Sequence, residues 1–280
     1  MTGTGTSSDG RVADVEFELL LEAIWRRYSY DFRNYARASL RRRVTGAMQR
    51  LGMSRMSELQ EGLLHDAGLF TRLLALLSVP VSDFFRDPEY FAALRHDVLP
   101  LLATYPSLKI WIAGCSTGEE VYSMAIVLDE LGLLDRTTIY ATDINPEALR
   151  TAEAGVYPLG RVQGFTRNYL AAGGTGSLSD YYTAAYDRVL FDRRLRSRVT
   201  FSDHSLATDA VFAEVQLVSC RNVLIYFDRV LQEHAVQLFH DALVPRGFLG
   251  IGSRESLHGF RASGAFEVVS RESRLYRRLA

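Results

Sequence analysis

The chain has 280 residues, of which 48% are hydrophobic and 23% are charged, and its formal net charge at pH 7 is −1. These proportions are typical of a globular protein with one or two domains. A chain with almost no net charge is not expected to bind polyanions such as nucleic acids. No apolar run reaches the roughly 18 residues needed to span a membrane. The two cysteines, Cys115 and Cys220, and the scattered histidines predict no disulfide framework and no metal site, so we expect a reduced, cytoplasmic protein.

The N-terminal part of the chain is predicted to be helical. Residues 1–10 lack the apolar core of a signal peptide and are predicted to form a disordered tail. Over 12–27 and 35–51 apolar residues recur at helical spacing, and two shorter helical segments follow. We therefore expect an all-α domain over 11–79.

This domain carries an unusually one-sided basic stretch. Between residues 24 and 55 the chain has nine arginines and one acid. Three of these arginines fall opposite the apolar face of the second helix: Arg42, Arg43 and Arg50. Such runs are usually solvated faces, but this one is unusually one-sided for a chain that is near neutral as a whole, so an acidic partner is a reasonable hypothesis.

A linker helix is predicted to follow, beginning in the segment VSDFFRDPEYF. Asp87 before Pro88 is a typical helix start, with the acid as the cap, and the helix should run to about Ala103. On these residues alone, the phenylalanine pair would dock the linker while Arg86 pairs with Asp83 or Asp87.

From residue 108 onward, short apolar strands alternate with helices. The strands are predicted at LKIWIAG, TTIYATD, VTFSDHS, EVQLVSC and FLGIGS, and a late hairpin or a final strand at FEVVSRESRLYRRL. The last long helix should begin near Arg229 and stop at Gly247. This alternation predicts an α/β domain over 80–280 with a doubly wound, mostly parallel sheet covered on both faces. Residues 157–198 interrupt it and are predicted to be an insertion.

Two motifs after the first two strands indicate a nucleoside site. In IAGCSTGEE, Gly114 and Gly118 would let the backbone approach a ligand, although a plain tight turn would also explain them. Asp143 ends the second strand, where an acid can accept hydrogen bonds from ribose hydroxyls; alternatively it caps the next helix with Asn145. Together the two motifs favour the nucleoside interpretation.

A third motif, LVSCRNVLIYFD, follows the fourth strand. Ligands of open α/β sheets bind outside the carboxyl ends of the strands, which is where Arg221 and Asn222 fall. The alternative is an Asn-type turn with a solvated arginine and Tyr226 in the core.

Together these segments resemble the chemotaxis receptor methyltransferase (CheR) family. The matching stretches are VSDFFRDPEYF, GCSTGEEVYSMAI, ATDINPEALRTAEAGVY, VSCRNVLIYFDRVLQE and GFLGIGSRESL, and they occur in the family's order. The resemblance implies a helical N-terminal domain, a Rossmann-like domain binding S-adenosyl-L-methionine (SAM), and a small β insertion. It also implies methyl transfer to receptor glutamates, with S-adenosyl-L-homocysteine (SAH) as product.

The resemblance also implies residue roles. The expected cofactor-binding residues are Ser82, Arg86, Gly114, Gly118, Glu119, Asp143, Ser205, Leu206, Arg221 and Asn222. Ser82 and Arg86 would approach the methionine portion, and Glu119 or Glu120 would hold its amino end. Asp143 would take the ribose, the Ser-Leu pair the adenine, and the Arg-Asn pair would close the pocket.

Arg86 and Tyr226 are the expected catalytic residues, positioning cofactor and substrate rather than transferring protons. Ser82 and Ser205 stand where the family commonly has Thr and Asn. These departures bear on the affinity for the cofactor and not on its identity. The expected partner is the acidic helical methylation region of chemoreceptors, bound by the basic helix of a monomer. Because the insertion looks long, pentapeptide docking is not expected. The competing interpretations are a non-catalytic SAM- or SAH-binding regulatory module and a small-molecule O-methyltransferase.

Overall fold

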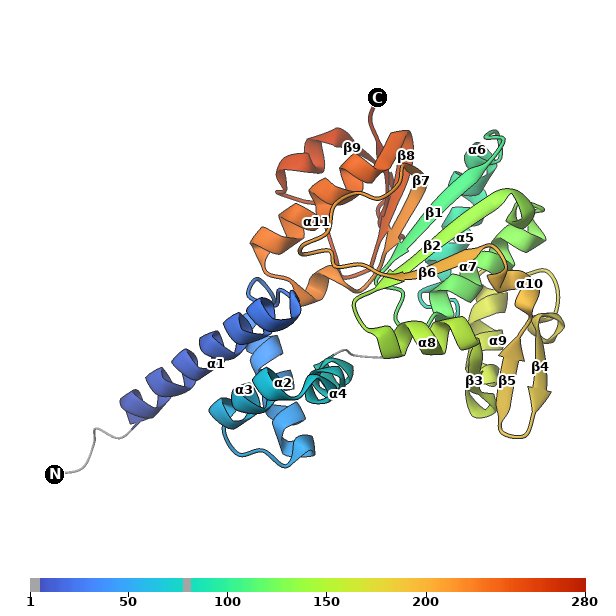
Figure 1. The fold of residues 1–280 in the computed structure, drawn as a ribbon. Coiled ribbons are helices and arrows are strands. Elements are labelled where there is room, and N and C mark those ends of the chain that lie inside the picture. The colour runs from blue at the N-terminus through green and yellow to red at the C-terminus, as the bar shows by residue number, and fades with distance from the viewer. Residues whose placement is uncertain (1–5, 78–81) are drawn as a thin grey trace. The chain divides into compact units, whose positions relative to one another are not determined.

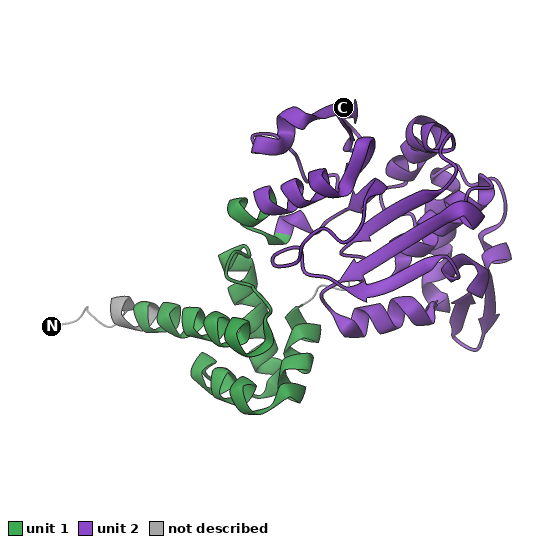
Figure 2. Ribbon diagram, turned by 45° about the horizontal axis from the view of Figure 1, so that its top comes forward, with its two compact units in different colours: residues 1–79, 226–232 green, residues 80–225, 233–280 purple. Residues whose placement is uncertain are grey.

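The computed structural model of the chain describes residues 6–77 and 82–280 (Figure 1). The chain divides into two compact units, which Figure 2 colours separately. Unit 1 comprises the chain up to residue 79 together with Tyr226–Gln232, and unit 2 comprises the remainder. Among the described residues, no helix combines the length and apolar character that crossing a membrane requires.

Unit 1 is built on four helices: α1 (Thr6–Tyr28), α2 (Arg37–Leu51), α3 (Met56–His65) and α4 (Ala67–Leu77). Their apolar faces pack together and bury Phe17, Leu40, Leu59 and Leu73. The tail expected over 1–10 is wrong for 6–10, because α1 already includes these residues; residues 1–5 lie outside the described part.

The main sheet of unit 2 has seven strands in the order β6-β2-β1-β7-β8-β10-β9. Their bounds are β1 (Leu108–Ala113), β2 (Thr137–Asp143), β6 (Val199–Asp203), β7 (Val215–Cys220), β8 (Leu243–Ile251), β9 (Phe266–Ser270) and β10 (Leu275–Arg278). The first five pair in parallel, and β10 pairs antiparallel with both β8 and β9. The predicted mostly parallel sheet and the late hairpin are therefore confirmed.

Helices cover both faces of this sheet. They are α5 (Pro88–Ala93), α6 (Leu99–Leu102), α7 (Glu119–Glu130), α8 (Pro146–Ala154) and α11 (Arg229–Ala242). Ile110 and Ile112 of β1 lie in the core cluster that holds the apolar residues of α7 and the linker helix. Trp111 between them faces the other way, with its ring 5.5 Å from that of Phe239 on α11. Because both faces of the sheet are covered, β1 is apolar and buried from Ile110 onward, whereas Lys109 near its start is exposed.

Two element boundaries differ from the prediction. The linker helix is broken by a π-helical turn (Leu94–Val98), and Asp87 makes no side-chain cap because its carboxylate binds elsewhere. The last long helix ends at Ala242 rather than at Gly247, and β8 begins directly after it. Pro245 disfavours helical backbone in the residue before it, which ends the helix early.

The insertion between β2 and β6 is a small antiparallel sheet with a helix. Its strands, in the order β3-β5-β4, are β3 (Val156–Pro158), β4 (Tyr182–Ala185) and β5 (Arg188–Phe191), accompanied by α9 (Val162–Ala171) and α10 (Arg193–Arg196). Phe191 stacks on Phe84 of the linker with ring centroids 4.4 Å apart. Both linker phenylalanines, Phe84 and Phe85, are fully buried, as expected for a docked linker. Short 3-10 turns connect the elements at Leu134–Arg136, Leu159–Arg161, Leu178–Tyr181, Leu224–Tyr226 and Arg261–Ala265.

Candidate functional site

The predicted cofactor residues of unit 2 gather where its parallel strands end. Gly114 follows β1, Asp143 ends β2, and Arg221 follows β7. Ser205 lies two residues beyond β6, and Gly252 follows β8. Since β1 lies between β2 and β7, the chain changes direction across the sheet at β1, and a doubly wound sheet opens a crevice for ligands at such a point.

The turn after β1 requires its two glycines. Gly114 has φ 73°, and a Cβ there would lie 2.4 Å from a methyl of Val223. Gly118 has φ 92°, and its Cβ would lie 2.6 Å from the Cβ of Ala152. A side chain at either position would be strained and would clash. The glycines are thus needed for a tight turn, and this does not conflict with their allowing a ligand to approach the backbone. The turn ends at the first residue of α7.

Asp143 braces this turn. Its Oδ2 accepts a hydrogen bond from the backbone N–H of Ser116 at 2.8 Å, and its Oδ1 accepts one from that of Asn145 at 2.9 Å. Burial raises the pKa of Asp143 above its usual range, and these backbone donors oppose that rise. Asn145 is the residue that caps α8 with its side chain. Each carboxylate oxygen of Asp143 keeps a further lone pair, so the group fits ribose hydroxyls.

Glu119, at the start of α7, is 1% exposed and already has partners. Its Oε1 accepts from Arg161 at 3.1 Å, and its Oε2 accepts from the Thr117 hydroxyl at 2.6 Å. Arg161 comes from the insertion and also donates to the carbonyl of Ser82 in the linker. A cofactor ammonium at Glu119 would therefore share this carboxylate with Arg161, a residue that sequence reasoning missed.

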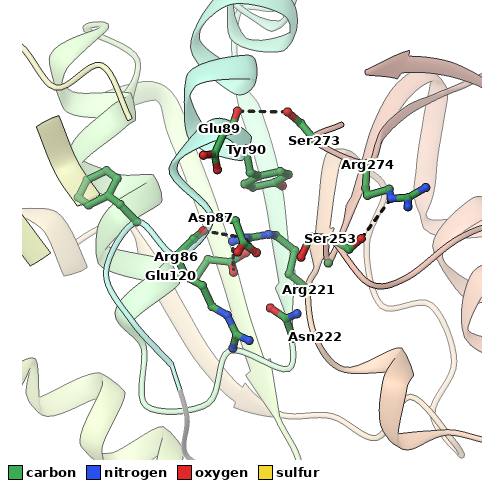
Figure 3. A network of polar contacts seen from close by, with 12 residues as sticks. Arg86, Asp87, Glu89, Tyr90, Glu120, Arg221, Asn222, Ser253, Ser273 and Arg274 are labelled. Atoms are coloured by element: carbon green, nitrogen blue, oxygen red, sulfur yellow. Dashed lines mark hydrogen bonds and ion pairs between the residues drawn. The ribbon is translucent and has the colours of Figure 1, made fainter. Parts of the chain in front are cut away.

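Arg221 is buried rather than solvated, with its side chain 1% exposed. It donates from Nη1 to Glu120 at 3.1 Å and from Nη2 to Asp87 at 2.8 Å. The same Nη2 donates to the carbonyl of Arg86 at 2.7 Å, and the guanidinium lies 4.2 Å from the ring centre of Tyr90 (Figure 3). The solvated-arginine alternative is wrong. The guanidinium holds the linker to α7 and β7.

Asn222, the next residue, has φ 61° and is held by a carboxylate that the sequence did not single out. Glu255 accepts from the backbone N–H of Asn222 at 3.1 Å, Ile225 at 3.2 Å and Gly252 at 2.5 Å. Burial raises the pKa of Glu255. In Figure 3 the side chains of Asn222 and Arg86 lie on the side of Arg221 away from Tyr90. The sequence did offer one signal for Glu255, since it is an acid that comes shortly after the fifth predicted strand, in GSRES.

The segment expected at the adenine is a compact turn after β6. Ser205 is half-buried, its Oγ accepts from the N–H of Ala207 at 3.3 Å, and its own N–H donates to Asp209 at 2.9 Å. Leu206 is 6% exposed. The serine hydroxyl thus stabilises its own turn, and the apolar leucine is the group suited to contact an adenine face.

In unit 1, Tyr226 lies against α2. The guanidinium of Arg43 lies 4.8 Å from its ring centre, and Arg43 also donates to the carbonyl of Leu77 at 2.8 Å. Burial lowers the pKa of Arg43, whereas Arg42 and Arg50 are exposed. The expected exposed basic face is therefore wrong for Arg43, because an arginine side chain can bury its stem and stack on an aromatic ring.

Most of the other basic residues near α2 are neutralised by acids of α1. The ion pairs are Arg37–Glu18, Arg41–Asp14, Arg26–Glu22 and Arg33–Glu22. Among the described residues, Arg42 and Arg50 have no carboxylate partner within ion-pair distance. On α2 these two arginines are exposed and remain available to a partner, as do Arg27 and Arg55 elsewhere in the basic stretch.

Two family models match the chain in succession. The one described as "CheR methyltransferase, all-alpha domain" matches residues 15–78, and the one described as "CheR methyltransferase, SAM binding domain" matches residues 80–274.

Named relatives match over most of the chain. It is 54% identical over 268 residues to "Putative methyltransferase Cher3" of Pseudomonas putida, covering 96% of this chain and 98% of that protein. It is 31% identical over 232 residues to chemotaxis protein methyltransferase 1 of Pseudomonas aeruginosa, covering 77% and 81%. It is 28% identical over 255 residues to the chemotaxis protein methyltransferase of Listeria monocytogenes, covering 88% and 92%. With both family domains matched in order, and a glycine turn braced by Asp143 at the carboxyl edge of its sheet, the chain belongs to the CheR family of SAM-dependent methyltransferases.

Proposed function

We propose that the protein transfers the methyl group of SAM to glutamate side chains on the cytoplasmic domain of chemoreceptors, forming methyl esters. The observation that carries the proposal is the glycine turn and Asp143 at the switch point of the sheet. Two relatives named as chemotaxis methyltransferases support the receptor as substrate. The acidic helical methylation region of a receptor would complement Arg42 and Arg50 of α2.

The chemistry asks little of the protein beyond alignment. When bound, SAM supplies a methyl group on a positively charged sulfur. A glutamate carboxylate is ionised at neutral pH, so it can attack without a general base. Holding the attacking oxygen in line with the breaking bond can contribute roughly 7–11 kcal/mol. A strong salt bridge to the attacking oxygen would stabilise the ground state and slow the reaction.

The residues of unit 2 divide these tasks. Asp143 accepts the ribose hydroxyls, and Leu206 contacts the adenine. Arg86 and Asn222, both turned away from Tyr90, contact the methionine portion. In this proposal no residue moves a proton.

The test is transfer of radiolabelled methyl groups from SAM to a panel of purified receptor cytoplasmic domains. Glutamate methyl esters release volatile methanol in base, which identifies the product. We expect base-labile label on at least one receptor, and Asp143→Ala as a matched control should incorporate far less. A receptor whose methylation-region glutamates are changed to alanine should incorporate none.

Other results would redirect the proposal. SAH binding without transfer to any receptor would favour a non-catalytic regulatory module. Base-stable label, or label on small molecules alone, would favour a different methyl acceptor.

A further inference from the structure

Arg86 lies between two residues with unusual backbone conformations. Phe85 has φ 51° and Asp87 has φ 53°, a left-handed region that residues with a side chain rarely adopt. Such conformations persist only where the surrounding structure enforces them, and they concentrate at functional sites. The question is what enforces them here.

On the N-terminal side, Phe85 is held from within the core. Its ring is fully buried, and its N–H donates to the hydroxyl of Ser123 on α7 at 2.9 Å. This contact fixes the chain as it enters Arg86, but it does not reach the peptide that follows.

On the C-terminal side, one guanidinium holds both Arg86 and Asp87. Nη2 of Arg221 donates to the Arg86 carbonyl at 2.7 Å and to the Asp87 carboxylate at 2.8 Å (Figure 3). The carboxylate and the preceding carbonyl therefore turn toward the same nitrogen. This arrangement requires the bend that the positive φ of Asp87 provides.

Arg221 is a rigid anchor for this contact. Glu120 binds its other terminal nitrogen, Tyr90 covers its face, and its side chain is 1% exposed. Tyr90 is itself fixed by a 2.7 Å hydrogen bond with Ser219 of β7. Movement of Asp87 is thus restricted by groups from α5, α7 and β7.

Helix capping does not account for Asp87. It precedes α5, but its side chain makes no capping hydrogen bond. An acid that only started the helix would have no need to bind Arg221 or to adopt a left-handed conformation. The negative charge of Asp87 is used on Arg221 instead.

We propose that Asp87 is a positioning residue that acts through Arg86. By binding Arg221, it keeps the strained bend that directs the Arg86 side chain to the side where Asn222 lies. The inference rests on the proposed function, because it assumes that Arg86 contacts the methionine portion of the cofactor. Asp87 itself contacts neither cofactor nor substrate.

A double-mutant cycle tests this. Four proteins are compared: wild type, Asp87→Asn, Arg86→Ala and the double variant. Asparagine keeps the size of aspartate and tolerates positive φ, but it loses the charge on Arg221. SAH affinity is measured by calorimetry and methyl transfer to a receptor domain by label, so the affinities do not depend on knowing the substrate.

We expect Asp87→Asn to weaken SAH binding about tenfold in the wild-type background and to have almost no further effect once Arg86 is alanine, since residues acting as a unit are not additive. The matched control, Asp97→Asn, changes an exposed acid of the same linker and should leave SAH affinity unchanged. Equal losses from Asp87→Asn in both backgrounds, or no loss in either, would overturn the inference.

Two further outcomes are distinguishable. If Arg86→Ala binds SAH and transfers methyl groups like wild type, both the role of Arg86 and this inference fail, while receptor methylation stands. If Asp87→Asn unfolds the protein, Asp87→Gly replaces it in the cycle, because glycine adopts positive φ without strain. The same non-additivity is then expected, and additive losses would again overturn the inference.

Discussion

The buried Arg221 and the exposed pair of Arg42 and Arg50 illustrate how the position of an arginine decides what its charge does. Arg221, at the carboxyl edge of the sheet, is buried between two carboxylates and an aromatic ring. Arg42 and Arg50, on the second helix of unit 1, are exposed and lack a carboxylate partner among the described residues. A buried charge organises its surroundings because leaving it unpaired is costly, whereas an exposed charge is free to attract a partner.

The largest expected effect comes from breaking the buried group. Arg221→Ala leaves the carboxylates of Glu120 and Asp87 without their cation, and we expect it to lower the free energy of unfolding by about 3–5 kcal/mol. Urea unfolding measures this. Arg167→Ala on α9, an exposed arginine of the same unit, is the control and should stay within about 0.5 kcal/mol of wild type. Similar midpoints for the two variants would show that Arg221 does not organise the site.

The next effect concerns a buried charge that is expected to bind a ligand. Asp143→Ala removes the two charge-assisted hydrogen bonds expected from the ribose, worth about 1.5–3 kcal/mol each. SAH affinity measured by calorimetry should fall accordingly, and Asp143→Asn, which keeps one acceptor oxygen, should lose less. Because Asp143 also binds the N–H of Ser116, the melting temperature should fall as well. A lower melting temperature with unchanged affinity would make Asp143 a brace of the turn and nothing more.

A third prediction uses the buried carboxyl of Glu255, whose pKa burial raises in the folded protein. Such a group favours folding most below the pKa of the unfolded chain, near 4.5, and this contribution is lost as the pH rises through the folded pKa. Glu255→Gln removes this dependence of stability on pH. The variant is also less stable by an amount that does not vary with pH, because its amide nitrogen cannot accept hydrogen bonds from the backbone N–H groups. As the pH rises, the unfolding free energy of the wild type should therefore fall relative to that of the variant, by at most about 1.4 kcal/mol per pH unit. A difference that is flat from pH 4 to 8 would contradict it.

The same contrast explains what sequence reasoning could and could not find. The parallel sheet, the glycine turn and Asp143 were predictable because each depends on residues close together in the chain. Asp87 was predicted to be a helix cap because an acid before proline usually is one. Its actual partner, Arg221, lies 134 positions away, and no local pattern connects them.

The prediction that Arg43 is exposed was wrong for the same reason. Its place on the helical wheel predicts exposure, but the segment around Tyr226 covers that part of α2. Glu255 was missed because its partners are backbone N–H groups, which every sequence offers equally. Local periodicity therefore located the elements and the edge of the site, while the charged contacts that fix its geometry came from distant parts of the chain.

The smallest expected effect tests the exposed side of the comparison. Arg42→Ala with Arg50→Ala should leave the core of unit 1 and SAH affinity unchanged, because both side chains are exposed. If the two arginines attract an acidic receptor helix, methylation of the receptor should slow several-fold at low ionic strength, since exposed charges contribute up to about 1 kcal/mol each. The loss should shrink as salt is added, because the Debye length falls to about 8 Å at 0.15 M ionic strength and about 3 Å at 1 M. Arg37→Ala is the matched control, since this arginine of α2 is already paired with Glu18 and has less charge to offer. Methylation by the double variant at the wild-type rate in low salt would show that the receptor docks elsewhere, and the inserted sheet would then be the next surface to test.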